Sequence, residues 1–370
     1  MLRYSLMIDQ IKAKIDLSLK NFLIRVKEEY KLGLVNKILF QSIKDFTLRK
    51  GKRIRPLLLI LSYRGYKKTA TPPPDSLYNA STCIEFLHNF MLIHDDIIDR
   101  SDLRRGKPTL HKLLCKAAKT SNQEKLGFDL SIIAGDIVYA LAIDAFLAID
   151  EDSQRKEEAL KHFISTAAFT AMGEFIDIIH SVEPLDRVRE KDVFLNYTLK
   201  TAKYTFECPL VIGAILAGAQ KDDITKLSKF GIMIGQAFQI QDDILGIFAS
   251  EKNIGKSILS DIAEFKKTIL VCHAFHKLAG KEKKVFLETF LKPKKTYADL
   301  VIIRKIFINS GSLEYSLRKT HALLSQAKYI LDDLSIRNSY RKLLWDSLSS
   351  LFDTSNKIAG QYRIPFSIHL

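Results

Sequence analysis

The feature that most constrains the fold is a helical spacing of apolar residues that recurs along the chain. In residues 76–99, SLYNASTCIEFLHNFMLIHDDIID, apolar side chains fall at 84, 87, 91 and 98, with 92 and 93 between them. This i, i+3, i+4, i+7 pattern predicts a helix with a broad buried face. The same pattern recurs in residues 130–150, 157–181, 194–219, 224–249, 312–334 and 339–360.

The predicted fold class is all-α, because no segment shows a convincing strand pattern. Hydrophobic residues make up 47% of the 370, with only 16 glycines and 9 prolines, which is typical of a helical globular protein. Several predicted helices are apolar almost all round, as the central helices of a large bundle are. Without a repeat, linker or composition break, the chain is expected to be a single domain over residues 1–370. Pro209 should kink its helix.

Charge and cysteine content restrict the environment and the partners. The formal charge of +15 fits a basic solvated surface, or a surface for nucleic acid, a membrane or a phosphorylated substrate. The four cysteines are far apart and lie in or beside apolar stretches, so we expect reduced thiols and a cytoplasmic protein. The N-terminus lacks the apolar run of a signal peptide, and no apolar run approaches the length of a transmembrane segment.

The helix of residues 76–99 ends in a group of carboxylates. Asp95 and Asp99 share one face because they are four residues apart, and Asp96 is offset by about 100°. Carboxylates this close repel unless a cation joins them, and Mg²⁺ prefers such oxygen ligands. A simpler reading is an exposed acidic end paired with nearby arginines. His88, two turns earlier, is either a core histidine or a ligand.

A second acidic group ends another apolar helical segment. Asp242 and Asp243 follow Gln239 by three and four residues, so the three side chains face a similar direction. Basic residues follow each acidic group along the chain, as in RRGKP and EFKKT. Carboxylates that hold Mg²⁺ and cations that hold phosphate oxygens together predict a diphosphate site, with apolar helices for a lipid tail.

Six motifs in order resemble the trans-prenyltransferases, the polyprenyl diphosphate synthases such as farnesyl and geranylgeranyl diphosphate synthases. The resemblance covers about residues 50–268. The motifs are GKRIRP at 51–56, DDIID at 95–99 with RRGKPT at 104–109, GDIVYALA at 135–142, KTA at 200–202, FQIQDD at 238–243, and GK, SDI and KKT within 255–268.

The resemblance implies a role for each matched position. The metal ligands would be the acidic residues Asp95, Asp96, Asp99, Asp242 and Asp243, of which Asp243 supports Asp242. The isopentenyl diphosphate site would comprise Lys52, Arg55, His88 and Arg105. The allylic diphosphate would be held by Arg104, Lys200, Lys256 and Lys266. The developing allylic cation would be stabilised by Thr201 and Gln239.

The resemblance also implies an activity, an architecture and an assembly. The activity would be head-to-tail condensation of isopentenyl diphosphate with an allylic prenyl diphosphate, using roughly three Mg²⁺ ions. The architecture would be a helical bundle of the isoprenoid synthase type with a central active-site cavity, assembled as a homodimer. Phe90 and Met91, about one turn before Asp95, would set an all-trans product of about 15 to 20 carbons.

Two departures from the family pattern leave alternatives open. Gly246 replaces a third aspartate, and Phe265 replaces a glycine before the last lysine motif, which fits a weakly active subunit of a heteromer. A class I terpene cyclase shares the first motif, but it usually has a different second motif and would leave GKRIRP without a role. Nucleic-acid binding follows from charge alone and explains none of the acidic motifs, so we expect no nucleic-acid partner.

Overall fold

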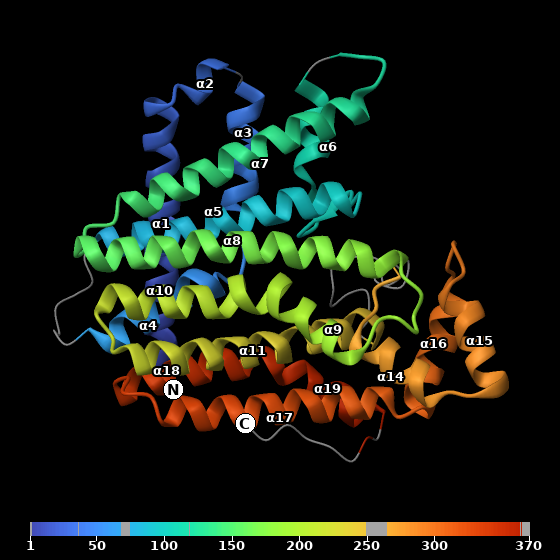
Figure 1. Cartoon of the computed structure of the whole chain (residues 1–370). Helices are drawn as coiled ribbons and strands as arrows, with labels where there is room; N and C mark the ends of the chain where they lie inside the picture. Colours follow the sequence, from blue (N-terminus) through green and yellow to red (C-terminus); the bar gives the residue numbers. More distant parts are fainter. Residues whose placement is uncertain are drawn as a thin grey trace. The chain divides into compact units, whose positions relative to one another are not determined.

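The computed structural model describes residues 2–35, 37–67, 75–117, 119–248, 265–362 and 364 (Figure 1). Its regular structure is almost entirely helical, which confirms the predicted all-α class. The chain forms two compact units: unit 1 is Met1–His162 with Pro209–Ala219, and unit 2 is Phe163–Cys208 with Gln220–Leu370. The expected single domain over residues 1–370 stays a prediction.

Unit 1 is built around α5 (Asp75–Ile98), which runs side by side with α7 (Gln123–Leu147) (Figure 1). Its Phe86 is fully buried against Phe22 of α1, with ring centroids 5.1 Å apart. Helices α1 (Leu2–Glu29), α3 (Lys37–Leu48), α4 (Ile54–Tyr66) and α6 (Leu110–Leu114) pack on this pair. Unit 1 also contains α2 (Leu32–Val35), the first part of α8 (Ser153–Val182) and α10 (Cys208–Ala217).

A small hairpin in unit 1 corrects the expectation that strands are absent. The strands β1 (Leu103–Arg104) and β2 (Lys107–Pro108) pair antiparallel immediately after α5. The two residues between them, Arg105 and Gly106, have φ values of 56° and 71°. Positive φ at both central residues is the type I′ geometry that matches the twist of a hairpin. The sequence signal is weak because an arginine occupies the first of these positions.

Helix α7 corrects the expectation that no apolar run approaches the length of a membrane span. By length and composition α7 passes that test, with a mean hydropathy of 1.9 over its most apolar window. Its side chains at Val138, Ala142 and Phe146 are buried, and the helix packs on α5 and α6 within unit 1. Burial in unit 1 accounts for part of the apolar content, since Ile132, Ile133 and Leu147 of the same helix are exposed.

Unit 2 is built around α11 (Lys221–Phe248), which packs between the π-helix η2 (Tyr197–Glu207) and α17 (Ser312–Asp332). The π-helix precedes Pro209, where a kink was expected. Its last turn closes through Cys208 N–H to the carbonyl of Lys203, five residues back. The other helices are α9 (Glu190–Asn196), α14 (Ile269–Lys277), α15 (Gly280–Phe290), α16 (Tyr297–Asn309), α18 (Asn338–Ser349) and α19 (Asp353–Gln361), with most of α8.

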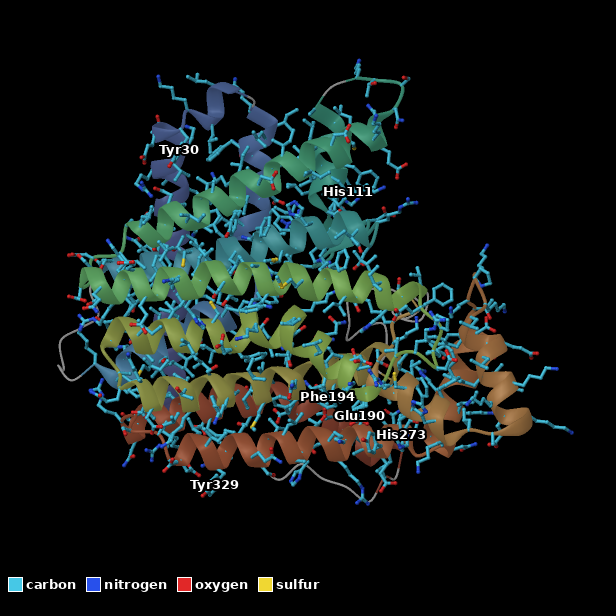
Figure 2. All side chains as sticks on the ribbon, in the orientation of Figure 1. Tyr30, His111, Glu190, Phe194, His273 and Tyr329 are labelled. Carbon is cyan, nitrogen blue, oxygen red and sulfur yellow. The ribbon has the colours of Figure 1, made fainter. Side chains whose placement is uncertain are left out.

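A polar cluster that includes Glu190 and His273 joins three of these helices (Figure 2). Glu190 of α9 accepts a hydrogen bond from Tyr315 Oη at 2.6 Å and pairs with Lys319 Nζ at 2.9 Å, both on α17. His273 of α14 stacks on the Tyr315 ring with centroids 4.2 Å apart. These contacts fix the start of α9 and the middle of α14 on α17, and so position the segments that precede each helix or follow it.

Close contact between α10 and α4 depends on Gly213. A Cβ there would lie 2.5 Å from the Leu59 carbonyl oxygen and 2.9 Å from the Tyr63 nitrogen, both of them backbone atoms that cannot rotate away. We therefore expect Gly213→Ala to lower the free energy of unfolding by about 1–3 kcal/mol, measured by urea denaturation.

Gly360 in α19 is the matched control, because a Cβ there would meet no atom within 4 Å. Alanine in an open helical position is favoured over glycine, so Gly360→Ala should leave stability unchanged or raise it by about 0.5–1 kcal/mol. Equal destabilisation by the two substitutions would contradict the packing argument.

Candidate active site

The acidic end of α5, which comprises Asp95, Asp96 and Asp99, has the predicted helical arrangement. The Asp99 N–H donates to the Asp95 carbonyl at 2.8 Å, so the two residues are one turn apart on the same face. Asp96 is buried and Asp95 is partly exposed. Arg104 of β1 donates from Nε to Asp96 at 2.7 Å and from a terminal nitrogen to Asp95 at 3.0 Å. One guanidinium therefore offsets the repulsion between two carboxylates.

The hairpin turn brings Arg105 to the predicted ligand His88 and to the first residue of the GKRIRP motif. Its guanidinium lies 3.5 Å from Nε2 of His88 on α5. It also lies so close to Gly51 that a Cβ at that position would be 3.1 Å from a guanidinium nitrogen. The first residues of the GKRIRP motif and the basic segment after α5 thus form one site. Lys52 is exposed beside Gly51, and Arg55 is partly buried in the first turn of α4.

Positive charge is concentrated around His88. Burial lowers the pKa of His88 well below its ordinary value, and the charges of Arg55, Arg105 and Arg104 add to that effect. Burial also lowers the pKa of Arg105, and the neighbouring Arg53 and Arg55 lower it further, although Glu85 opposes them. Cations that destabilise one another's charge are stabilised by an anion, so this part of unit 1 suits a diphosphate.

Two arginines that motif reasoning did not single out support this site. Arg53, buried at the start of α4 with φ of 50°, pairs with Glu85 at 2.7 Å and Asp16 at 2.9 Å. Arg49, also buried, donates to the carbonyls of Arg104 and Pro108 at 3.4 and 2.8 Å, one on each strand of the hairpin. Arg49 therefore holds the hairpin in place, and its only sequence signal was its position in a basic run.

In unit 2 the predicted pair Thr201 and Gln239 forms a chain of hydrogen bonds. The Thr201 hydroxyl donates to Gln239 Oε1 at 2.6 Å, and Gln239 Nε2 donates to Asp243 at 3.0 Å. Tyr197 Oη donates to the other oxygen of Asp243 and accepts from the Ile269 N–H at 3.0 Å. Asp243 is thus held by two side chains, whereas Asp242 beside it is exposed, which fits a supporting role for Asp243.

The predicted lysines of unit 2 lie in two places. Lys200, in the π-helix, pairs with Glu174 at 2.8 Å and Asp177 at 2.6 Å, both on α8. Lys266 is partly exposed just before α14. Its neighbour Lys267 is buried and donates to the carbonyls of His180 and Ser181 at the end of α8. Lys267 is therefore structural, and Lys256 lies outside the described residues.

The two departures from the family pattern have different surroundings. Gly246 is buried in α11, close to the end of the helix. Phe265 has φ of 53°, in the left-handed region that glycine adopts most readily. Its ring packs edge-on against Phe290, with centroids 6.2 Å apart, and Lys295 Nζ lies 3.8 Å from its centroid. Aromatic packing therefore holds a backbone conformation that glycine would adopt without strain.

The predicted chain-length residues lie one turn before the acidic end of α5. Phe90 and Met91 are both partly buried. The Phe90 ring lies between His94, with centroids 4.7 Å apart, and Tyr139 of α7, with centroids 4.9 Å apart. An aromatic group from two helices is thus present where a product floor was predicted, and Tyr139 is the member that sequence reasoning missed.

The donor chemistry of both acidic groups fits Mg²⁺ bound together with a diphosphate. All the candidate ligands are carboxylates, which are hard oxygen donors. Among the described residues, no three His, Cys, Asp or Glu side chains gather closely enough to hold a metal ion by themselves. Mg²⁺ is usually bound by one or two carboxylates, with water and substrate phosphates completing its shell, so such a cage is not required.

The chain belongs to the polyprenyl synthetase family, whose model matches residues 36–306. A short chain isoprenyl diphosphate synthase of Methanocaldococcus jannaschii is 33% identical over 298 residues, which cover 80% of this chain and 84% of the relative. A geranylgeranyl diphosphate synthase of Saccharolobus solfataricus is 34% identical over 317 residues, 84% of this chain and 86% of the relative. The chain is accordingly a prenyltransferase, as the six ordered motifs predicted.

Solved structures agree with this family. A geranylgeranyl pyrophosphate synthase from Corynebacterium glutamicum, complexed with isoprenyl diphosphate and magnesium, has a TM-score of 0.85 at 26% identity and covers 94% of this chain and 99% of its own. The geranylgeranyl pyrophosphate synthetase from Pyrococcus horikoshii has a TM-score of 0.79 at 26% identity, covering 95% and 99%.

The lowered pKa of His88 makes stability depend on pH in a definite direction. As pH falls below the ordinary value of 6.5, the unfolded chain binds a proton at His88 before the folded protein does. His88 therefore contributes stability above pH 6.5 that is lost as pH decreases toward its folded pKa. We expect His88→Gln to lose less stability than the wild type between pH 7 and pH 5 in urea denaturation. The exposed His276→Gln is the control and should keep the wild-type slope, and a His88→Gln slope as steep as the wild type would refute this account.

Proposed function

We propose that this prenyltransferase condenses isopentenyl diphosphate head-to-tail with an allylic prenyl diphosphate to form a short-chain all-trans product. The observation that carries the proposal is the arginine cluster around the neutral His88, because the second diphosphate of a condensation needs a cationic site of its own. A terpene cyclase uses a single diphosphate and would leave this cluster without a ligand. The short-chain synthases among the relatives support the same choice.

Each set of side chains has a role in this reaction. Lys52, Arg55, His88 and Arg105 bind isopentenyl diphosphate, and the buried neutral imidazole orients one phosphate oxygen by hydrogen bonding. The allylic diphosphate is bound by Arg104, Lys200, Lys256 and Lys266. The acidic residues Asp95, Asp96, Asp99 and Asp242 would hold roughly three Mg²⁺ ions, with Asp243 in support. Bound Mg²⁺ would stabilise the charge that builds on the leaving diphosphate.

The condensation then needs positioning more than covalent catalysis. The allylic C–O bond breaks, and diphosphate leaves with the bonding electrons. The double bond of isopentenyl diphosphate attacks the allylic carbon, and a proton lost from the new cation passes to the released diphosphate. The allylic cation is stabilised by the negative ends of two dipoles. One is the backbone carbonyl of Thr201, and the other is the side-chain oxygen of Gln239. Apolar helices exclude the water that would otherwise trap the cation.

Radiolabelled isopentenyl diphosphate, a panel of allylic primers and Mg²⁺ test this function with the purified chain alone. We expect Asp95→Asn and Asp242→Asn each to lower the condensation rate by about 10²–10³, because each removes charge stabilisation from the transition state. Asp222→Asn is the matched control on the same helix as Asp242. Asp222 is exposed, and its one ion pair among the described residues is with Lys226, so the rate should not change.

The double variant and the products separate the alternatives. If both acidic groups act on one diphosphate, the double variant Asp95→Asn with Asp242→Asn should have a condensation rate only slightly below that of the slower single variant. A hydrocarbon released without isopentenyl diphosphate would favour a cyclase. Inactivity that a second protein restores would favour a subunit of a heteromer.

We also propose that Phe90 sets product length at about 15 to 20 carbons, because it lies in the aromatic group with His94 and Tyr139. We expect Phe90→Ala to lengthen the product by one or more isoprene units, resolved by chromatography. Tyr139→Phe keeps the ring and should leave product length unchanged. If Phe90→Ala gives products of unchanged length, Phe90 does not limit the length of the product chain.

A homodimer and a cytoplasmic location are the remaining parts of the proposal. Helix α8 exposes a stripe of large apolar side chains in unit 2, among them Met172, Phe175 and Val182, which suits a second copy of the chain. Light scattering should give twice the 42.2 kDa chain mass, and a single-chain mass at every concentration would contradict the dimer. The four cysteines are free thiols, in keeping with a reducing compartment, which cell fractionation would test.

A further inference from the structure

The hairpin of α15 and α16 carries a mixed basic and apolar surface that the condensation reaction does not use. We call this surface the basic tip. It lies on the exposed side of α15, in the loop after it, and at the first residue of α16. Its members are Lys281, Lys284, Val285, Leu291, Lys292, Lys294 and Tyr297, all of them exposed.

Positive charge predominates in this segment. Residues 277–297 contain seven lysines and two glutamates. Two of the basic-tip lysines have acidic partners, since Lys284 lies 3.9 Å from Glu288 and Lys292 lies 2.8 Å from Asp299. The lysine excess nevertheless leaves a strong local field, which adds to the formal charge of +15 for the whole chain.

Large apolar side chains stand among these lysines. Val285, Leu291 and Tyr297 are 44%, 55% and 64% exposed. They are not part of the core, because α15 packs on unit 2 through Phe286 and Phe290 on its other side. Lysines interspersed with exposed aliphatic and aromatic groups are the composition of surfaces that lie at the interface of an anionic bilayer.

The loop of the basic tip is held in one conformation. Thr296 and Asp299 form a capping box at the start of α16, with Asp299 accepting from the Thr296 N–H at 2.7 Å. The buried Lys295 donates to the Lys292 carbonyl at 3.0 Å, and its Nζ lies 3.8 Å from the Phe265 ring centroid. An ordered loop pays little conformational entropy on binding. The same contact joins the tip to Phe265, the residue before Lys266.

We propose that the basic tip docks the protein reversibly on an anionic lipid bilayer. The lysines interact with the headgroups, while Val285, Leu291 and Tyr297 enter the boundary with the acyl chains. The alternative anionic partner of this charge is nucleic acid, whose phosphate backbone binds through charge and does not require exposed aliphatic side chains. The apolar stripe of α8 differs from the tip, because residues 163–182 contain no lysine or arginine that would attract an anionic surface.

Vesicle sedimentation with the full chain tests the docking without substrates, so its outcome is independent of the prenyltransferase activity. The chain should bind vesicles that mix phosphatidylcholine with phosphatidylglycerol, should not bind pure phosphatidylcholine, and should bind less as salt increases. Lys281→Gln with Lys284→Gln should weaken binding by about tenfold to thirtyfold, because each lysine near an anionic surface contributes to the attraction.

A second variant separates a bilayer from nucleic acid. Val285→Ser with Leu291→Ser keeps every lysine and should weaken vesicle binding by about tenfold, since it removes the side chains that enter the interface. The same variant should not change any binding of duplex DNA. Leu17→Ser with Ile24→Ser, two exposed apolar positions of α1, is the matched control and should bind like the wild type.

Thermal melting of each variant verifies that the fold is kept. Three outcomes would each overturn the proposal. They are equal binding to neutral and anionic vesicles, unchanged binding in either tip variant, and binding to duplex DNA without binding to vesicles.

Discussion

The site in unit 1 depends on placing like charges close together at the end of one helix and the start of another. Asp95 and Asp96 are tolerated because Arg104 reaches both of them, and Arg104 is available because a two-residue turn returns the chain immediately after α5. The same turn directs Arg105 toward His88 and Gly51. One short hairpin therefore balances the acidic group and completes the cationic group. Arg49 holds the hairpin in place by donating hydrogen bonds to its backbone carbonyls.

In unit 2 a carboxylate of the acidic group is held by neutral side chains. Asp243 is held by hydrogen bonds from Tyr197 and Gln239, and Gln239 in turn accepts from Thr201. These bonds join α11 to the π-helix, and Tyr197 extends them to the first residue of α14. The residues that bind an anion in our proposal thus lie on segments that a polar network orders, which limits the reorganisation needed when charge develops.

Local periodicity predicted more of this molecule than long-range contacts did. The all-α class, the shared face of Asp95 and Asp99, and the contact between Gln239 and Asp243 follow from residues four apart on a helix. The resemblance to prenyltransferases gave Thr201 and Gln239 one shared role and His88 and Arg105 another, but not the contacts between them. Neither source indicated Arg49, Arg53 or Tyr197, because their partners lie far away in sequence. The hairpin was missed since Arg105 is an unusual residue for a left-handed position.

The π-helix that carries Lys200 and Thr201 has a consequence for how such a chain tolerates insertions and deletions. A π-turn holds about one residue more than an α-turn, so a segment of this kind contains surplus backbone. Deletion of one residue between 197 and 207 would remove this surplus and allow an ordinary α-helix to form. The segments before and after it would keep their relative orientation, whereas side chains within the segment would change direction relative to their partners on α8 and α11. The number of residues in this segment is therefore constrained as much as their identity.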